Sequence, residues 1–258
     1  MRVSQIIPIP AVILGLPLRE SENPYLVAEV GSTRIEVEVE ECKEPSVAAG
    51  ATDDLAGQVV SFAKRLLKEL GLDACINLKW SAPEGTPRAG LYASLTAHIL
   101  KSVARAYGES LEVYEILEYA RLLDDLETGW GAWHSVVDAL RYASLMGGTV
   151  VYRNDEEYAK LSNTTVRGFK ESSLIVKEQL FDKETLGPDL YGALIHTVGV
   201  LVLEGAVRVR DSNRKPSLKP LIQLHNHLAH FFWGLSTPEG SILSPGLWPE
   251  FERIKLLD

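Results

Sequence analysis

The sequence has little cysteine and no excess of basic residues. Only two of its 258 residues are cysteines, Cys42 and Cys75, too few for a disulfide framework or a multi-cysteine zinc site. A reducing cytosol suits two such residues. The 26 lysines and arginines stand against 35 aspartates and glutamates, so the net charge is -9. This charge excludes nucleic acid as the main partner but allows a small anion held by main-chain amides.

Long apolar runs are also absent. No uninterrupted run reaches about 18 residues, so we expect no membrane-spanning helix. The N-terminus has neither the charged start nor the apolar run and cleavage site of a signal peptide. We therefore expect a cytoplasmic protein with a small-molecule substrate, with no nucleic-acid or membrane partner, and able to form a homodimer.

The patterns that are present indicate an α+β fold. Residues 33–40 alternate strictly, with Ile35, Val37 and Val39 on one face and glutamates 36, 38 and 40 on the other, which is typical of a strand with one buried face. Residues 3–14 carry two prolines and predict an edge strand or two short pieces. Helical periodicity appears at 54–70, 91–107, 110–126, 188–207 and 218–234. The polar stretch 154–171 predicts a crossing between two domains, residues 1–160 and 161–258.

The loop at residues 81–91 has the pattern of an anion site. It follows a predicted strand at 74–80, contains two prolines and two glycines, and precedes a helix. Glycines let the main chain approach a phosphate, and a helix N-terminus offers free N–H groups. The candidate contacts are Gly85, Arg88, Gly90, Leu91 and Ser94. An ordinary strand-helix connection with an exposed arginine is the alternative.

The same loop and the sequence after it resemble the GHMP kinases, which include galactokinase, homoserine kinase, mevalonate kinase and phosphomevalonate kinase. Their second motif reads Pro-x-x-x-Gly-Leu-Gly-Ser-Ser-Ala, and here Gly90-Leu91 and Ser94 match it. Downstream, Glu127, Ser135 and Asp138 in ETGWGAWHSVVDALRYASLMGG keep the family's mutual spacing. The resemblance is closest to the branch of mevalonate kinase, phosphomevalonate kinase and mevalonate diphosphate decarboxylase.

The resemblance implies a two-domain fold, with a ribosomal-protein-S5-domain-2-like N-terminal domain and a ferredoxin-like C-terminal domain that is either full or truncated. It also implies a small-molecule kinase of isoprenoid biosynthesis that transfers the γ-phosphate of ATP to a mevalonate-like metabolite. In this reading the loop residues and Ser135 bind ATP, while Ser94 and Glu127 bind Mg²⁺. Asp138 then activates the acceptor group.

Several positions depart from the family pattern. Ala11 stands where the opening motif has a lysine, which leaves Asp138 without that cation. Tyr92 and Ala93 replace a glycine and a serine of the loop, and the third glycine-rich motif is missing after Trp248. Two alternatives therefore stay open. One is a catalytically degenerate GHMP-kinase-like binding or regulatory protein, and the other is a decarboxylase-type lyase acting on a phosphorylated acid.

Two further groups of residues resemble a catalytic triad and a metal site but do not fit either. His134, Ser135 and Asp138 are too close in sequence to build a Ser-His-Asp hydrogen-bond chain. On a helix His225 lies about 200° around the axis from His227, so the histidines at 225, 227 and 230 cannot bind one metal together.

Overall fold

The computed structural model describes residues 1–18, 23–50, 55–124, 131–153, 157–162, 169–176, 179–211, 217–237, 240–247 and 250–256. Its strands are β1 (Arg2–Leu14), β2 (Tyr25–Glu41), β3 (Ser46–Ala49), β4 (Ala74–Ser81), β5 (Thr149–Arg153), β6 (Glu157–Ser162), β7 (Phe169–Ile175), β8 (Ser241–Pro245) and β9 (Glu250–Leu256). Its helices are α1 (Ala56–Glu69), α2 (Arg88–Ala106), α3 (Val113–Leu123), α4 (Gly131–Met146), α5 (Lys183–Leu186), α6 (Pro188–Arg210) and α7 (Lys219–Trp233).

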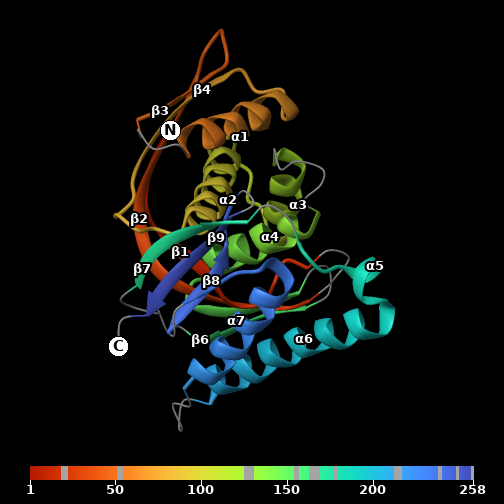
Figure 1. Ribbon diagram of the computed structural model, residues 1–258. Helices are drawn as coiled ribbons and strands as arrows, with labels where there is room; N and C mark the ends of the chain where they lie inside the picture. Colours follow the sequence, from red (N-terminus) through yellow and green to blue (C-terminus); the bar gives the residue numbers. More distant parts are fainter. Residues whose placement is uncertain are drawn as a thin grey trace.

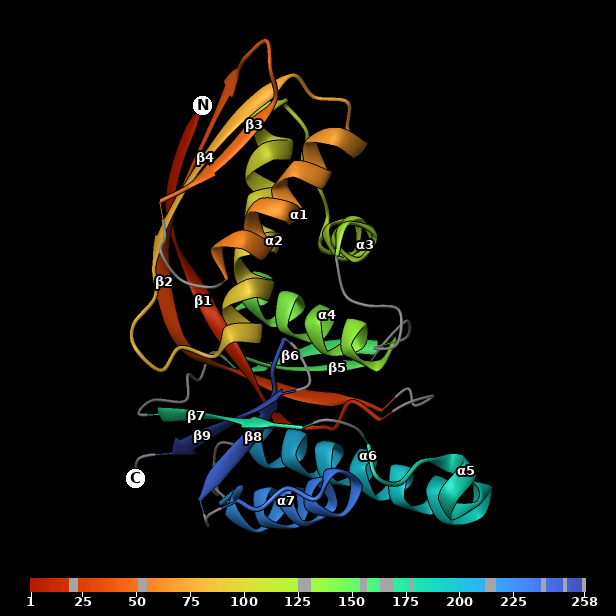
Figure 2. The same ribbon diagram turned by 45° about the horizontal axis from the view of Figure 1, so that its top comes forward.

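The larger sheet is built around the long strand β2. Its order is β3-β4-β2-β5-β6, and β1 pairs antiparallel with β2 along most of its length. Helices α1 to α4 cover one face of this sheet (Figures 1 and 2). The mixed arrangement confirms the expected α+β class.

A second layer forms from the C-terminal part of the chain. Strands β7, β9 and β8 make an antiparallel sheet in that order. Helices α6 and α7 lie at the bottom of Figure 2, beyond this sheet and the lower part of β1. Their apolar side chains share a core with the second half of β1 and the first half of β2. The two ends of the chain are thus packed on each other along β1 and β2.

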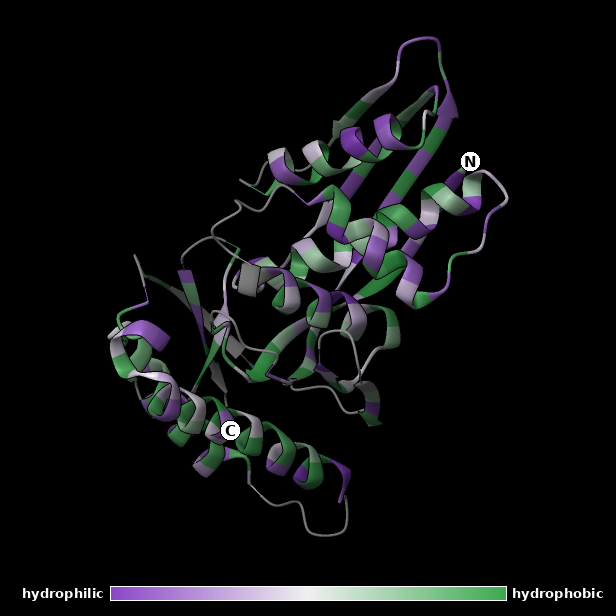
Figure 3. Ribbon diagram, turned by 90° about the vertical axis from the view of Figure 1, so that its right-hand side faces the viewer, coloured by the Kyte–Doolittle hydropathy of each residue, from purple (hydrophilic) through white to green (hydrophobic). Residues whose placement is uncertain are grey.

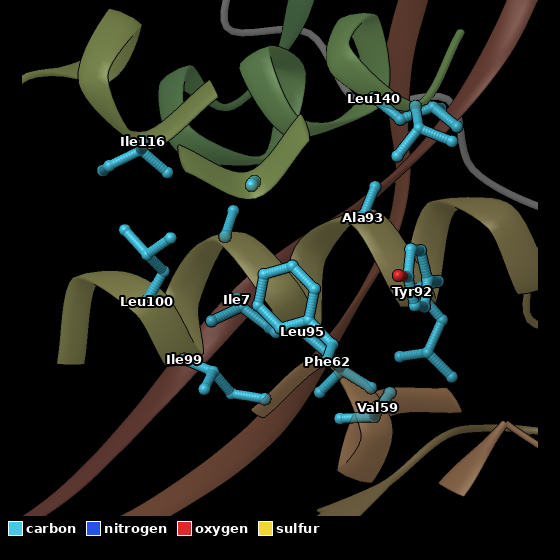
Figure 4. Packing of buried hydrophobic residues seen from close by; sticks show 14 of the residues in the cluster. Ile7, Val59, Phe62, Tyr92, Ala93, Leu95, Ile99, Leu100, Ile116 and Leu140 are labelled. Carbon is cyan, nitrogen blue, oxygen red and sulfur yellow. The ribbon is translucent and has the colours of Figure 1, made fainter. Parts of the chain in front are cut away.

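The predicted periodicities explain the first core. Ile35, Val37 and Val39 of β2 are buried, whereas the acidic residues between them are half-buried or exposed. Helix α1 buries one face, and α2 lies at the centre with buried side chains all round. Figure 4 shows Phe62 of α1 against Leu95 and Ile99 of α2. Burial of this kind stabilises a fold by about 1.5–3 kcal/mol per large apolar side chain.

Strand β1 is one strand with irregular pairing. Among the described residues it pairs only with β2, which agrees with the expected edge position. The register shifts between Ile9 and Pro10 and again between Val12 and Leu14. Proline has no N–H to donate to a ladder, so the bulge beside Pro10 follows from the sequence.

The polar stretch at 154–171 differs from its prediction. Residues 157–162 form β6 and pair antiparallel with β5, with Ala159 opposite Val151. The stretch also contains the beginning of β7. The predicted domain boundary at 160 remains a prediction.

The cysteines differ as well. The sequence suggested that a reducing cytosol suits them, but Cys42 and Cys75 are joined by a disulfide in the structure. The bond links the end of β2 to the start of β4, with 5.7 Å between the Cα atoms. It closes a loop over a sequence separation of 33 residues.

Helix α6 departs from the expectation about apolar runs. It has 23 residues and a mean hydropathy of 1.7 over its most apolar 18-residue window, of which 33% is buried. The helix is long and apolar enough to cross a membrane, but many core helices of globular proteins have the same length and composition. Figure 3 shows hydrophobic residues along α6 and α7 at the bottom of that view.

Candidate functional site

The predicted anion loop joins β4 to α2. Thr86 closes a turn because its main-chain N–H and its hydroxyl both donate to the carbonyl of Pro83. Gly85 adopts a φ of 78°, which favours glycine over any side-chain-bearing residue. Pro87 precedes the first turn of α2, where its missing N–H costs nothing. The local sequence therefore builds a defined helix start.

The first amide of α2 is bound by the protein itself. The main-chain N–H of Arg88 donates to Oε1 of Glu252 at 2.7 Å. Glu252 belongs to β9 and its side chain is completely buried (Figure 2 shows β9 reaching the start of α2). The guanidinium of Arg88 lies 3.7 Å from the carboxylate of Glu250, on the same strand. A helix N-terminus favours an anion, and here a side chain of the C-terminal sheet takes that place.

Gly90 and Ser94 face strand β1. A Cβ atom on Gly90 would lie 1.9 Å from the carbonyl oxygen of Pro10, so only glycine lets α2 cross β1 here. One turn later the hydroxyl of Ser94 donates to the carbonyl of Pro8 at 2.7 Å, and Ser94 is fully buried. Leu91 is buried in the first core. These placements do not fit a phosphate or a magnesium ion held by Gly90, Leu91 or Ser94.

Asp138 lies inside the helical layer. It is fully buried on α4, and Nε and Nη2 of Arg121 on α3 lie 2.8 and 2.7 Å from its Oδ2. Nη1 of Arg141 lies 3.5 Å from its other oxygen. Burial raises the pKa of Asp138, and the two arginines oppose that rise. The lysine of the family's opening motif is absent, and two arginines supply positive charge at Asp138 instead.

Arg141 is the centre of this network. Its guanidinium binds both carboxylate oxygens of Asp124 at 2.5 and 2.7 Å, and its side chain is completely buried. It also donates to the hydroxyl of Thr96 at 3.1 and 3.2 Å. The phenol of Tyr92 donates to Asp124 at 2.9 Å. Tyr92 therefore points into the core, as Figure 4 shows, and away from the loop where it replaces a family glycine.

The remaining predicted site residues lie apart or cannot be placed. Ser135 is buried on α4, and its hydroxyl is 3.0 Å from the phenol of Tyr25, whose pKa burial raises to about 12. Gly85 and Arg88 stay together at the loop. Glu127 lies outside the described residues. The structure thus brings together Gly85, Arg88 and Gly90, and places Ser135 and Asp138 on another helix.

Among the cavities formed by described residues, two lie away from the predicted loop. One of about 430 Å³ lies along α7 and the segment after it, lined by Asn226, His227 and His230 among others. The other, of about 280 Å³, is apolar and lies between the ends of α1, α2 and α3. Neither includes a residue of the predicted loop. Among the described residues there is no group of three side chains suited to a metal ion.

Sequence reasoning missed Glu252 and Arg141. Arg141 does leave a signal, since it is an arginine in the otherwise apolar run VVDALRYA, three residues after Asp138. A charge in such a run must find a buried partner. Glu252 leaves no comparable signal, because it lies 164 residues from Arg88 in a segment rich in charge.

Comparison with known proteins identifies the fold. No family model and no curated protein matches the sequence. Among solved structures, mevalonate kinase from Methanococcus jannaschii matches with a TM-score of 0.62 and 12% identity, over 100% of this chain and 91% of that one. Phosphomevalonate kinase from Streptococcus pneumoniae matches with a TM-score of 0.58 and 9% identity, over 100% and 92%. Mevalonate diphosphate decarboxylase from Legionella pneumophila matches with a TM-score of 0.55 and 9% identity, over 99% and 93%.

These likenesses extend over the whole chain and include both kinases and a decarboxylase of one branch. At such low identity they establish the fold alone. The chain has the fold of the GHMP kinases, as its motifs predicted.

Proposed function

We propose that this chain is a non-catalytic binding or regulatory protein that uses the GHMP-kinase fold. The observation that carries the proposal is the carboxyl group of Glu252 on the first amide of α2. An ATP phosphate at this helix start would meet a buried carboxyl group that already accepts the hydrogen bond. A hydrogen bond to a charged group contributes about 1.5–3 kcal/mol. A ligand that displaces Glu252 from this amide must first offset the free energy of the hydrogen bond that is lost.

The other expected roles support the same proposal. A metal-binding hydroxyl needs a free oxygen directed at the ion, but the Ser94 hydroxyl is directed at Pro8. A catalytic base must come within about 3 Å of the proton it accepts. Asp138 is fully buried and bound to Arg121. The predicted metal ligand Ser94 and the predicted base Asp138 thus each have a role in the fold.

The second candidate is the kinase that the motifs predicted. It would use ATP and Mg²⁺ to phosphorylate a mevalonate-like metabolite in the cytoplasm. One observation favours it: the whole chain matches a Streptococcus pneumoniae phosphomevalonate kinase solved with phosphomevalonate and AMPPNP, with a TM-score of 0.59 and 8% identity. For this function the Glu252 side chain must move away from the first amide of α2, so that a phosphate can bind there. The decarboxylase-type alternative rests only on the structural match to mevalonate diphosphate decarboxylase from Legionella pneumophila.

Calorimetry and turnover decide between the candidates. The purified chain is titrated with AMPPNP at millimolar Mg²⁺, and is assayed for phosphoryl transfer to mevalonate, phosphomevalonate and homoserine. The proposal expects neither nucleotide heat nor product. ATP-dependent product that disappears in Asp138→Asn would overturn it in favour of the kinase.

Two variants connect the test to the observation. Glu252→Gln keeps the shape of the side chain and removes its negative charge, so we expect inorganic phosphate or AMPPNP to bind more tightly than to the wild type. Glu250→Gln is the matched control, because Glu250 is a partly exposed glutamate of the same strand whose carboxylate lies 3.7 Å from the Arg88 guanidinium. Equal phosphate affinity in all three proteins would show that Glu252 does not occupy an anion site.

A further inference from the structure

Helix α6 presents an apolar stripe to the outside of the molecule. Its inner side packs on the sheet so closely that a Cβ on Gly205 would lie 2.6 Å from Leu14 of β1 and 3.0 Å from Leu26 of β2. On the outer side Val200, Leu203 and Val207 are 48%, 57% and 61% exposed. A single exposed leucine needs no explanation, but a continuous stripe does.

The stripe has the spacing of a helix-pairing seam. Ala193, His196, Val200, Leu203 and Val207 are all exposed and follow one another at intervals of three, four, three and four residues. At 3.6 residues per turn these five side chains lie within about 80° of each other around the axis. Alternating steps of three and four are the a/d repeat by which two helices interlock.

The ends of α6 carry opposite charges. Asp189 lies in the first turn and Arg210 in the last turn, whereas the neighbouring Arg208 is bound to Glu204 of the same helix at 2.9 Å. In an antiparallel pair of identical helices, the acidic end of each meets the basic end of the other. The two helix dipoles are then antiparallel, which is electrostatically favourable. A surface that complements itself under a two-fold rotation is the requirement for an isologous dimer.

We propose that α6 is the contact surface of a homodimer, in which α6 packs antiparallel on α6 of a second copy around a two-fold axis near Val200 and Leu203. In this register Val200 meets Leu203 of the copy, and His196 meets Val207. The helix is about 35 Å long, and pairing along it buries an area of the order of 1,000 Å², the lower bound of a specific interface.

A lipid surface fits the stripe less well. Helices that lie on membranes carry many basic residues on their polar face and aromatic residues on the other. Helix α6 has two arginines, both at one end, and its Tyr191 is buried. The chain's net charge of -9 also opposes adsorption to anionic lipid.

Sedimentation equilibrium from about 1 to 100 μM tests the proposal. The wild type should approach twice the chain mass of 28.5 kDa. Leu203→Glu should raise the dissociation constant at least tenfold, because it places two glutamates at the axis. Leu122→Glu on α3 is the matched control, since Leu122 is 80% exposed and distant in the fold from α6, and it should leave the dimer intact. A thermal melt confirms that each variant is folded.

A charge exchange tests the orientation. Asp189→Lys should weaken the dimer, and adding Arg210→Glu should restore it. A parallel pair would not respond in this way, because like ends already meet. A monomeric wild type at 100 μM, or a Leu203→Glu dimer as tight as the wild type, would refute the proposal. So would a monomer that floats with anionic phospholipid vesicles in a Leu203-dependent manner, since the stripe would then be a lipid surface.

Discussion

Replacing Arg141 with methionine should destabilise the protein strongly. Arg141 is completely buried, binds both oxygens of Asp124, and contacts Thr96 and Asp138. Methionine keeps much of the apolar volume of the side chain and removes its charge. Asp124 then keeps the hydrogen bond from the Tyr92 phenol, which carries no charge that could neutralise a buried carboxylate.

The structure sets the size of the effect. Removing one partner of a buried ion pair costs about 3–5 kcal/mol, because the other charge remains buried and uncompensated. Asp138 adds little to this cost, since its bond to Arg121 survives and the Arg121 side chain is 36% exposed to water. We therefore expect a loss of about 4 kcal/mol, a large part of the 5–15 kcal/mol that stabilises a typical domain.

Urea unfolding followed by circular dichroism measures this loss. Arg2→Met is the matched control, because Arg2 forms an exposed ion pair with Glu36, and its unfolding midpoint should not change measurably. Both variants need an unchanged m-value for the comparison to hold. A loss below about 1 kcal/mol for Arg141→Met would refute the reasoning, and would mean that water or a rearranged side chain solvates Asp124.

Three further predictions follow from single features. Gly90→Ala should lower the free energy of unfolding by about 3 kcal/mol in a urea titration, because its Cβ would overlap a main-chain oxygen of β1. Gly57→Ala is the control on α1, where a Cβ meets no other atom, and it should raise the free energy of unfolding by about 0.5–1 kcal/mol. Burial lowers the pKa of His98 to about 4. The free energy of unfolding should therefore be highest above pH 6.5 and fall by about 3 kcal/mol as the pH drops to 4, because the unfolded chain takes up the proton first. His98→Gln should flatten this pH profile. Reducing the Cys42–Cys75 bond should cost about 3–4 kcal/mol from loop entropy, seen as a lower melting temperature with dithiothreitol, and Cys42→Ser should abolish that response.

Local patterns predicted much of the fold. The alternation at Ile35, Val37 and Val39 determines which face of β2 is buried, and helical periodicity located α1, α2, α6 and α7 to within a few residues. Both signals depend only on neighbours in sequence. Strand β6 was missed because its ladder with β5 supplies the pairing that its polar composition does not suggest. The outward stripe of α6 was missed because apolar residues look the same in sequence whether buried or exposed.

The candidate site was less predictable because its contacts are long-range. The loop and helix start were located from glycine and proline positions. The group that occupies the helix start comes from β9, and its hydrogen bond spans 164 residues. Gly90 was assigned to phosphate binding, but its lack of a side chain is required by the carbonyl of Pro10. A glycine shows that something approaches the main chain closely, and sequence alone does not say whether it is ligand or protein.

The departures at the site follow one physical rule. A buried helix start needs an acceptor, and the carboxyl group of Glu252 supplies it where a phosphate oxygen would otherwise lie. A buried carboxylate needs cations, and Arg121 and Arg141 supply them to Asp138 from α3 and α4. The lysine position cannot do so, because Ala11 is fully buried in the second core, where an ammonium group would lose its hydration. If the proposed non-catalytic function is correct, these contacts take the places of a nucleotide phosphate and of the family lysine, and reversing one substitution alone should not restore nucleotide binding.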